Sequence, residues 1–179
     1  MVRSMAPKTG RMAVVLPHGA LFRGNSEGCI REKLVKMDLL EAVIGLGPNL
    51  FYGTGLAACI LVFRQRKTDE HKHKLLFIDA SREFKAGRAH NELLPKHVDR
   101  IYTWYRDFKD VSGVARVATL DEIAANDYNL NIPRYVQPEV EEVTISVEQA
   151  LEDLKKAALG AFAAEDRLLA ILKKEGMLE

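Results

Sequence analysis

Short apolar runs, each ended by a turn or by charged residues, constrain this sequence more than any other feature. Five such runs are five to eight residues long and rich in Val, Ile and Leu, which is the length and composition of β-strands rather than of helices. They lie at residues 11–16, 39–46, 57–63, 75–79 and 114–118. The chain is therefore expected to build a sheet, and the first strand is expected to be buried.

Segments with helical spacing of apolar residues lie between and after these strands. Residues 27–37 and 92–108 carry them at three- and four-residue intervals, and Pro95 is expected in the first turn of the second segment. Thr119-Leu120-Asp121-Glu122 is a capping box that opens a short helix. The order strand, helix and three further strands predicts an α/β fold. It contains too few strand–helix units for a complete doubly wound domain.

The composition changes after Pro138. Ser146-Val147-Glu148-Gln149 forms a second capping box, which predicts a helix that reaches about Lys174. Its apolar residues follow one stripe, which includes Val147, Leu151, Leu154, Ala158, Phe162, Leu168 and Leu172. We therefore expect one domain at residues 1–136 and a helical segment at residues 137–179.

Composition and charge are those of an ordinary soluble protein. Hydrophobic residues make up 47% and charged residues 28% of the 179 residues, and the net charge is +1. A neutral balance does not indicate nucleic acid, yet it permits DNA binding if charges segregate onto different faces. The longest apolar run has eight residues, whereas a membrane span needs about 20. No membrane association is expected, and two lone cysteines indicate buried thiols in a reducing, cytoplasmic environment.

Three other motifs have alternative interpretations. The Gly53–Ala58 segment fits the G-x-G-x-x-A pattern, but it precedes a strand instead of opening a helix, which argues against a phosphate loop. His71-Lys72-His73 is read as a solvated hairpin rather than a metal pair, because no cysteine or carboxylate cluster completes a site. His18-Gly19 is either a functional loop or a simple strand exit, and both stay open.

Residues 47–55, GPNLFYGTG, place two adjacent aromatics between glycines and immediately before an apolar strand. Phe51 and Tyr52 either fold onto the core or form a stacking platform for a flat ligand. Spacing favours the core interpretation.

Five segments together resemble a known family. VVLPHGALFRG, IREKLV, AVIGLGPNLFYGTGLAACILVF, LLFIDAS and DYNLNIPRYV, in this order, resemble the modification (M) subunit of type I restriction–modification systems, which are S-adenosylmethionine-dependent N6-adenine DNA methyltransferases. The resemblance covers most of residues 10–136 and departs at Gly47-Pro48, where the family more often has Leu-Pro. It implies the later half of a Rossmann-like methyltransferase sheet, followed by a helical C-terminal extension.

The resemblance also implies what this chain lacks. The family's glycine-rich cofactor loop and its [N/D]PP[F/Y] motif, which holds the target amine, do not occur in the sequence. The chain therefore looks like the C-terminal part of an M subunit and is expected to contain no catalytic residue and no metal ligand. S-adenosylmethionine is the family's cofactor, but we expect no measurable binding by this chain alone.

Site residues and partners follow from the same resemblance. An aromatic before the penultimate strand stacks on the flipped adenine in related enzymes, which points to Phe51, with Tyr52 in reserve. The loops near the active site would include His18, Gly19, Asn49, Gly53, Thr54 and Gly55. The implied partners are DNA and the specificity (S) and restriction (R) subunits, with Leu151, Leu154, Phe162, Leu168 and Leu172 docking on the S subunit. The alternatives are that the last helix packs on its own domain, or that the chain is a non-catalytic interaction module or a homo-oligomer.

Overall fold

The structure is a computed structural model that describes residues 2–137 and 146–177. The chain divides into two compact units, residues 1–139 and residues 140–179. Among the described residues, no helix is both long and apolar enough to cross a membrane. The assignment of the two units to a catalytic-domain portion and a docking segment stays a prediction.

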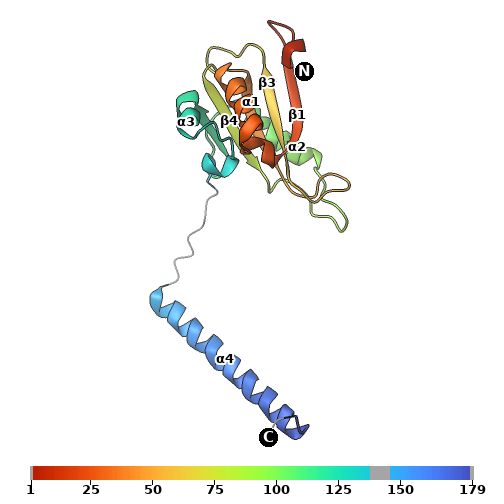
Figure 1. Ribbon diagram of the computed structural model, residues 1–179, viewed down its shortest axis with the longest axis vertical. Coiled ribbons are helices and arrows are strands. Elements are labelled where there is room, and N and C mark those ends of the chain that lie inside the picture. Colours follow the sequence, from red (N-terminus) through yellow and green to blue (C-terminus); the bar gives the residue numbers. More distant parts are fainter. Residues whose placement is uncertain (1, 138–145, 178–179) are drawn as a thin grey trace. The chain divides into compact units, whose positions relative to one another are not determined.

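The first unit is built on a five-stranded mixed sheet (Figure 1). Its strands are β1 (Arg11–Pro17), β2 (Leu40–Leu46), β3 (Ala58–Arg64), β4 (Lys74–Ala80) and β5 (Ala115–Thr119), arranged in the order β1-β3-β2-β4-β5. β2 and β4 are parallel, and every other pair is antiparallel. The predicted strands are confirmed, each to within one residue at either end.

The prediction that the first strand is buried is wrong. β1 alternates between exposed and half-buried residues because it lies at an edge of the sheet and pairs only with β3. Val15, for example, is 52% exposed. β2 is buried throughout, since β3 and β4 flank it. An apolar run reports that a segment is a strand, but not how many neighbours that strand has.

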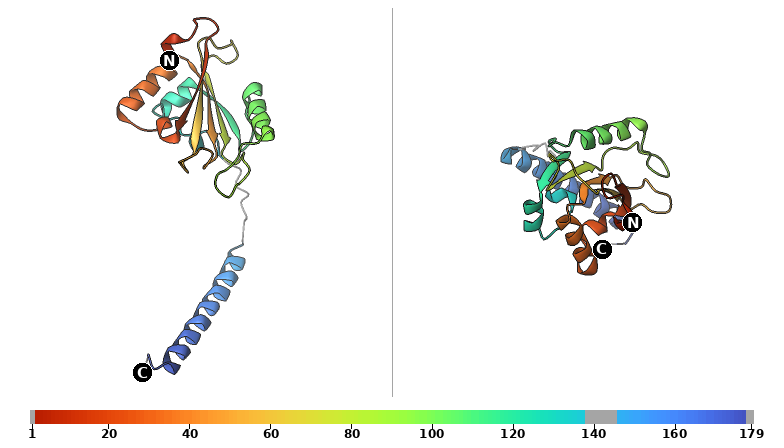
Figure 2. Two further views of the ribbon diagram at one scale, coloured as in Figure 1. Left: turned by 90° about the vertical axis from the view of Figure 1, so that its right-hand side faces the viewer. Right: turned by 90° about the horizontal axis from the view of Figure 1, so that it is seen from above.

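Helices cover both faces of the sheet. α1 (Asn25–Lys36) and α3 (Leu120–Ala125) lie on one face, and α2 (Pro95–Asp107) lies on the other (Figure 2). Short 3-10 turns occur at Val2–Ser4 (η1), His18–Leu21 (η2) and Ile132–Arg134 (η3). Each face has its own core. Val35, Phe77 and Ile123 are buried on the first face, and Leu76, Ile78 and Ile101 are buried on the second.

The DYNLNIPRYV segment closes the first core. Tyr135 stacks on Phe77 of β4, with ring centroids 3.9 Å apart and planes 8° apart. Its hydroxyl donates to the Asn129 carbonyl at 2.7 Å. Buried Arg31 of α1 donates from Nε to the Tyr128 carbonyl at 2.7 Å, and its Nη1 donates to two further backbone carbonyls. This motif therefore fastens the last part of the unit to the sheet and to α1.

The second unit contains α4 (Val147–Lys174). The predicted capping residue is confirmed, since the Ser146 hydroxyl accepts from the Gln149 amide at 3.1 Å. Most large apolar side chains of α4 are exposed, namely Val147, Leu151, Leu154, Leu159, Phe162, Leu168, Leu169 and Ile171. Leu172 and Ala158, which the sequence also places on the stripe, are half-buried. An amphipathic helix of this kind gains most of its stability when its apolar face packs on a partner surface.

Candidate functional site

The carboxyl ends of β1 and β2 bring two predicted site segments together. His18 follows β1 directly, and its Nε2 lies 2.9 Å from the carbonyl oxygen of Ala58, where β3 begins. A Cβ added to Gly45 of β2 would lie 3.5 Å from His18 Cε1. His18 is therefore half-buried against the sheet, and Gly19 lies in the 3-10 turn that follows.

The aromatic loop does not fold onto the core, so the interpretation favoured by spacing is wrong. Phe51 is 40% exposed and Tyr52 is 87% exposed. Phe51 and Thr54 form an isolated antiparallel bridge, so both aromatics lie at a tight turn. Gly53 has φ +79°, which a residue with a side chain rarely adopts. The sharp backbone turn between Phe51 and Thr54 leaves both aromatic side chains exposed to solvent.

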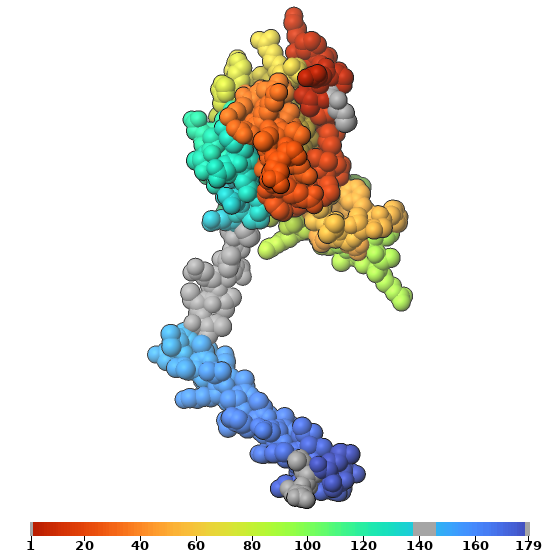
Figure 3. Space-filling model, in the orientation of Figure 1, coloured from red at the N-terminus to blue at the C-terminus, as the bar shows by residue number. Residues whose placement is uncertain are grey.

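A second loop, residues 85–92, holds the aromatic loop in place. Asn91 donates from its backbone amide to the Asn49 carbonyl at 2.7 Å and from Nδ2 to the Pro48 carbonyl at 2.8 Å. The Asn49 side chain donates in return to the Ala89 carbonyl at 3.3 Å. The rings of Tyr52 and His90 are 4.9 Å apart. The two loops protrude side by side in the space-filling view, amber and yellow-green (Figure 3).

The glycine pattern at residues 53–58 is not a phosphate loop. β3, not a helix, begins at Ala58, so no helix N-terminus is available to an anion. The Thr54 hydroxyl instead accepts from the Leu56 amide at 3.1 Å, and the Asn49 amide donates to the Gly55 carbonyl at 3.3 Å. Thr54 and Gly55 shape the loop that carries the aromatics.

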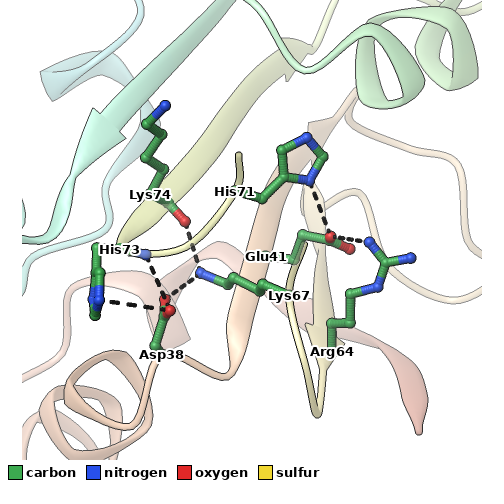
Figure 4. Close-up of polar contacts among 7 residues, drawn as sticks. All are labelled: Asp38, Glu41, Arg64, Lys67, His71, His73 and Lys74. Carbon is green, nitrogen blue, oxygen red and sulfur yellow. Dashed lines mark hydrogen bonds and ion pairs between the residues drawn. The ribbon is translucent and has the colours of Figure 1, made fainter. Parts of the chain in front are cut away.

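The opposite end of the sheet holds a charged cluster that was not predicted from the sequence (Figure 4). Glu41 is 1% exposed, and its two oxygens receive Arg64 Nη1 at 2.8 Å and the Tyr105 hydroxyl at 2.7 Å. The register of β2 on β3 shifts between Leu40 and Ala42, so Glu41 is the extra residue of a bulge. Bulges re-aim side chains, which explains how a carboxylate on a buried strand reaches these partners. Burial and the Glu41 contact raise the pKa of Tyr105 to about 12, so the phenol remains a donor.

The His71–His73 hairpin is only partly solvated, which corrects the expectation from its charge. His71 stacks on Phe108, with centroids 3.7 Å apart, and its Nδ1 lies 3.5 Å from Glu41 Oε1. His73 is exposed, as expected, with Nδ1 4.0 Å from an Asp38 oxygen. Across residues 2–137 and 146–177, no group of three His, Cys, Asp or Glu side chains is placed to hold a metal ion.

Lys67 anchors the base of this hairpin. Its ammonium is buried and donates to Asp38 Oδ1 at 2.5 Å and to the Lys74 carbonyl at 2.7 Å. Burial lowers the pKa of Lys67, and the Asp38 contact opposes that shift. The Asp38 carboxylate also accepts from the His73 amide at 3.0 Å. Both buried charges of the cluster, Glu41 and Lys67, therefore have partners, which is the condition for keeping charges inside a protein.

The first unit matches known proteins along its whole length. The family model described as N-6 DNA Methylase matches residues 1–143. The MjaVII methylase subunit of a type I restriction enzyme from Methanocaldococcus jannaschii is 40% identical over 149 residues, which is 82% of this chain and 26% of that protein. The MpnII methylase subunit from Mycoplasma pneumoniae is 33% identical, over 77% of this chain and 25% of that protein.

A solved structure extends the comparison to the fold. The methyltransferase subunit of a type I restriction–modification system from Streptococcus thermophilus superposes with a TM-score of 0.67 and 42% identity, over 72% of this chain and 27% of that one. The chain thus spans about a quarter of the length of the curated relatives it matches. The resemblance to type I modification subunits and the predicted methyltransferase sheet are confirmed. This chain belongs to the N-6 DNA methylase family.

Proposed function

We propose that this chain is part of the modification subunit of a type I restriction–modification enzyme, which methylates adenine N6 in DNA with S-adenosylmethionine. One observation supports the role of this segment within that activity: two exposed aromatics lie on a loop that a second loop holds by backbone and side-chain hydrogen bonds. Family membership supplies the reaction class. The segment would supply the surface that receives the target base.

The chemistry of base methylation explains why exposed aromatics are useful here. A base inside a duplex must be flipped out before its exocyclic amine can react, at a cost of a few kcal/mol. Stacking on an aromatic side chain is worth about 1–3 kcal/mol per base, which offsets much of that cost. Phe51 is the proposed platform because it is half-exposed and fixed by its bridge to Thr54. Tyr52 contacts the ring of His90 and is the second candidate for this role.

The other loop residues would act by positioning. Asn49 adopts φ +55° and links the two loops through its side chain and its backbone carbonyl. Gly53, Thr54 and Gly55 set the turn beneath the ring. His18 fixes the start of β3 through Ala58 and lies beside the sheet, not at the loop tip. None of these residues has to touch the methyl donor for the loop to work.

Replacing Phe51 with alanine should slow methylation of a paired adenine by about 5- to 150-fold, because one stacking interaction is lost. The measurement is methyl transfer to duplex DNA by the complete modification enzyme that carries this segment. The matched control is Phe22→Ala, which removes a similarly exposed ring (48%) outside the loop and should leave the rate unchanged.

A mismatched target separates base flipping from a general defect. An adenine opposite a non-pairing base costs less to flip, so Phe51→Ala should lose less activity on that substrate. Equal losses on paired and mismatched adenine, or an unchanged rate on both, would contradict the stacking role.

The residues present do not fit the methyl donor. The sequence contains no Asn-Pro-Pro or Asp-Pro-Pro string, and its G-x-G-x-x-A pattern at residues 53–58 precedes a strand. We therefore expect that isothermal titration of this chain with S-adenosylmethionine detects no binding at micromolar concentrations. The same titration with the complete enzyme is the positive control. Heat of binding with the chain by itself would show that the cofactor site lies within these residues.

We propose a second role for α4, as a helix that docks on the S subunit. Its uncovered apolar stripe supports this role, since exposed leucines in such an arrangement are typical of helix-in-groove recognition. The R subunit and DNA would contact this chain only within the assembled enzyme. Self-association through the same stripe is the competing outcome.

Changing Leu154 to aspartate should weaken binding to the S subunit by about tenfold or more, because a charge would be buried in an apolar contact. Ala163→Asp is the matched control, since it adds the same charge at an exposed position on the opposite side of α4. Co-purification and sedimentation would measure both. Intact S binding by Leu154→Asp would refute docking, and a dimer that Leu154→Asp dissociates would assign the stripe to self-association.

A further inference from the structure

A basic hollow lies at the end of the sheet opposite the aromatic loop. Its volume is ≈ 360 Å³, and three segments form it: the turn before β1, the first residue of β1 and the chain that leaves β3. The residues lining it are Lys8, Thr9, Arg11, Arg64, Arg66, Lys67, Thr68 and Asp69. Five of the eight carry positive charge and one carries negative charge, although the whole chain has a net charge of only +1. Positive charge is therefore concentrated at this hollow.

The ion pairs within the chain neutralise only part of the positive charge of the hollow. Lys67 is neutralised by Asp38, and Arg64 by Glu41. Asp69, the acid of the hollow, pairs with Lys72 at 2.5 Å. Within the part of the chain that the structure describes, the side chains of Lys8, Arg11 and Arg66 make no ion pair. Three cations of the hollow therefore carry charge beyond these ion pairs, and Asp69 is the one acid among the residues that line it.

The strand register adds an independent observation. Arg11 of β1 lies directly opposite Arg64 of β3. Like charges facing one another across antiparallel strands are destabilising. Arg64 is also fixed by its hydrogen bond to buried Glu41, so it cannot swing away without leaving that carboxylate short of a partner (Figure 4). Glu41 compensates Arg64, but Arg11 has no carboxylate partner among the described residues, so Arg11 beside a fixed Arg64 points to an anion that would contact both.

We propose that this hollow binds phosphate groups. Arg11 and Arg64 supply guanidinium donors that match phosphate oxygens, Lys8 and Arg66 supply further charge, and the hydroxyls of Thr9 and Thr68 can donate to the same oxygens. Arg64 is pre-oriented, because Glu41 receives one of its five N–H groups and leaves the others. The site takes a phosphodiester backbone or a free polyphosphate, which share this chemistry.

The hollow is separate from the proposed base platform. β1 runs from Arg11 to Pro17, and seven residues of strand span about 20 Å. His18 and the aromatic loop lie at the far end of that span. A duplex held at the hollow would therefore be contacted well away from the target adenine. The inference does not depend on the proposed methylation, since it rests on the charges and the register.

The test is titration of this full chain with inorganic tripolyphosphate and, separately, with a short DNA duplex at low salt. The variant Lys8→Gln/Arg11→Gln/Arg66→Gln should bind both about tenfold more weakly or worse, because charge-assisted hydrogen bonds are lost. The control, Lys33→Gln/Lys96→Gln/Arg134→Gln, removes three exposed charges outside the hollow and outside the two loops of the base platform, and should change binding by less than about twofold. Without ligand, Arg11→Gln should keep or raise the melting temperature, because it relieves the Arg11–Arg64 repulsion.

Each outcome decides the proposal. Binding of tripolyphosphate that duplex DNA displaces, with a steep salt dependence, assigns the site to the DNA backbone. Binding of tripolyphosphate that duplex DNA does not displace assigns it to a free polyphosphate. The proposal is overturned if the wild-type chain binds neither ligand, or if both triple variants weaken binding equally, which would indicate nonspecific attraction. A fall in melting temperature for Arg11→Gln without ligand would also overturn it, by showing that Arg11 is needed for the fold.

Discussion

Replacing Glu41 with alanine is expected to lower the free energy of unfolding of the first unit by about 3–5 kcal/mol, the usual effect of removing one partner from a buried ion pair. Glu41 is almost fully buried, and its oxygens serve Arg64 and Tyr105. Its loss leaves the guanidinium of Arg64, whose side chain is only 17% exposed, without its carboxylate partner. The substitution also removes the side chain at the bulge of β2 that links this strand to Arg64 of β3 and to Tyr105 of α2.

Urea denaturation followed by the fluorescence of Trp104 measures this effect, because Trp104 is the only tryptophan in the chain and packs on the core beneath α2. Glu32→Ala is the control. It removes an exposed i,i+4 partner of Lys36 and should change stability by about 0.5 kcal/mol or less. Glu41→Gln keeps an acceptor oxygen and should fall between the two. A Glu41→Ala protein as stable as the Glu32→Ala protein would mean that the cluster is energetically neutral.

Phe77→Ala should cost about 3–5 kcal/mol of stability, the usual effect of emptying a buried aromatic site. Phe77 is fully buried in β4 and stacks face to face on Tyr135. Its removal would leave a cavity and would release the segment that closes the first core. The same denaturation experiment applies, with Phe22→Ala as a control ring that is 48% exposed.

A second variant tests what the stack contributes beyond burial. Tyr135→Phe preserves the ring pair but removes the hydroxyl that donates to Asn129, so it should cost only about 0.5–1.5 kcal/mol. If Tyr135→Phe were as damaging as Phe77→Ala, the hydrogen bond rather than the aromatic core would hold the segment.

The secondary structure could be predicted closely because local rules decide it. Apolar runs, Pro95 at the start of α2 and the capping residues Thr119 and Ser146 each act within a few residues. The burial of β1 could not be predicted, since it depends on a neighbour that no local pattern encodes. Cys29 likewise proved exposed, whereas Cys59 is buried as expected.

The candidate site could be predicted only in part for the same reason. GPNLFYGTG identifies the aromatic loop, but its exposure depends on Asn91, 40 residues beyond Phe51 in the sequence. In the sequence, Glu41 is one polar residue in an apolar run, and only the bulge in the structure reveals its orientation. The Arg11–Arg64 register is set by strand pairing across more than fifty residues. A carboxylate inside a strand pattern is the signal in the sequence that could have indicated the cluster.

The edge position of β1 has a consequence for how this unit behaves at high concentration. One row of backbone amides and carbonyls on β1 faces no strand among the described residues, and five residues between Arg11 and Pro17 are free of charge and proline. Such a row is a template for an added strand from any extended polypeptide. Arg11 and Pro17 act as gatekeepers that shorten it. The solubility of this unit therefore depends on what caps that row, and aggregation would begin along β1 before the buried strands are exposed.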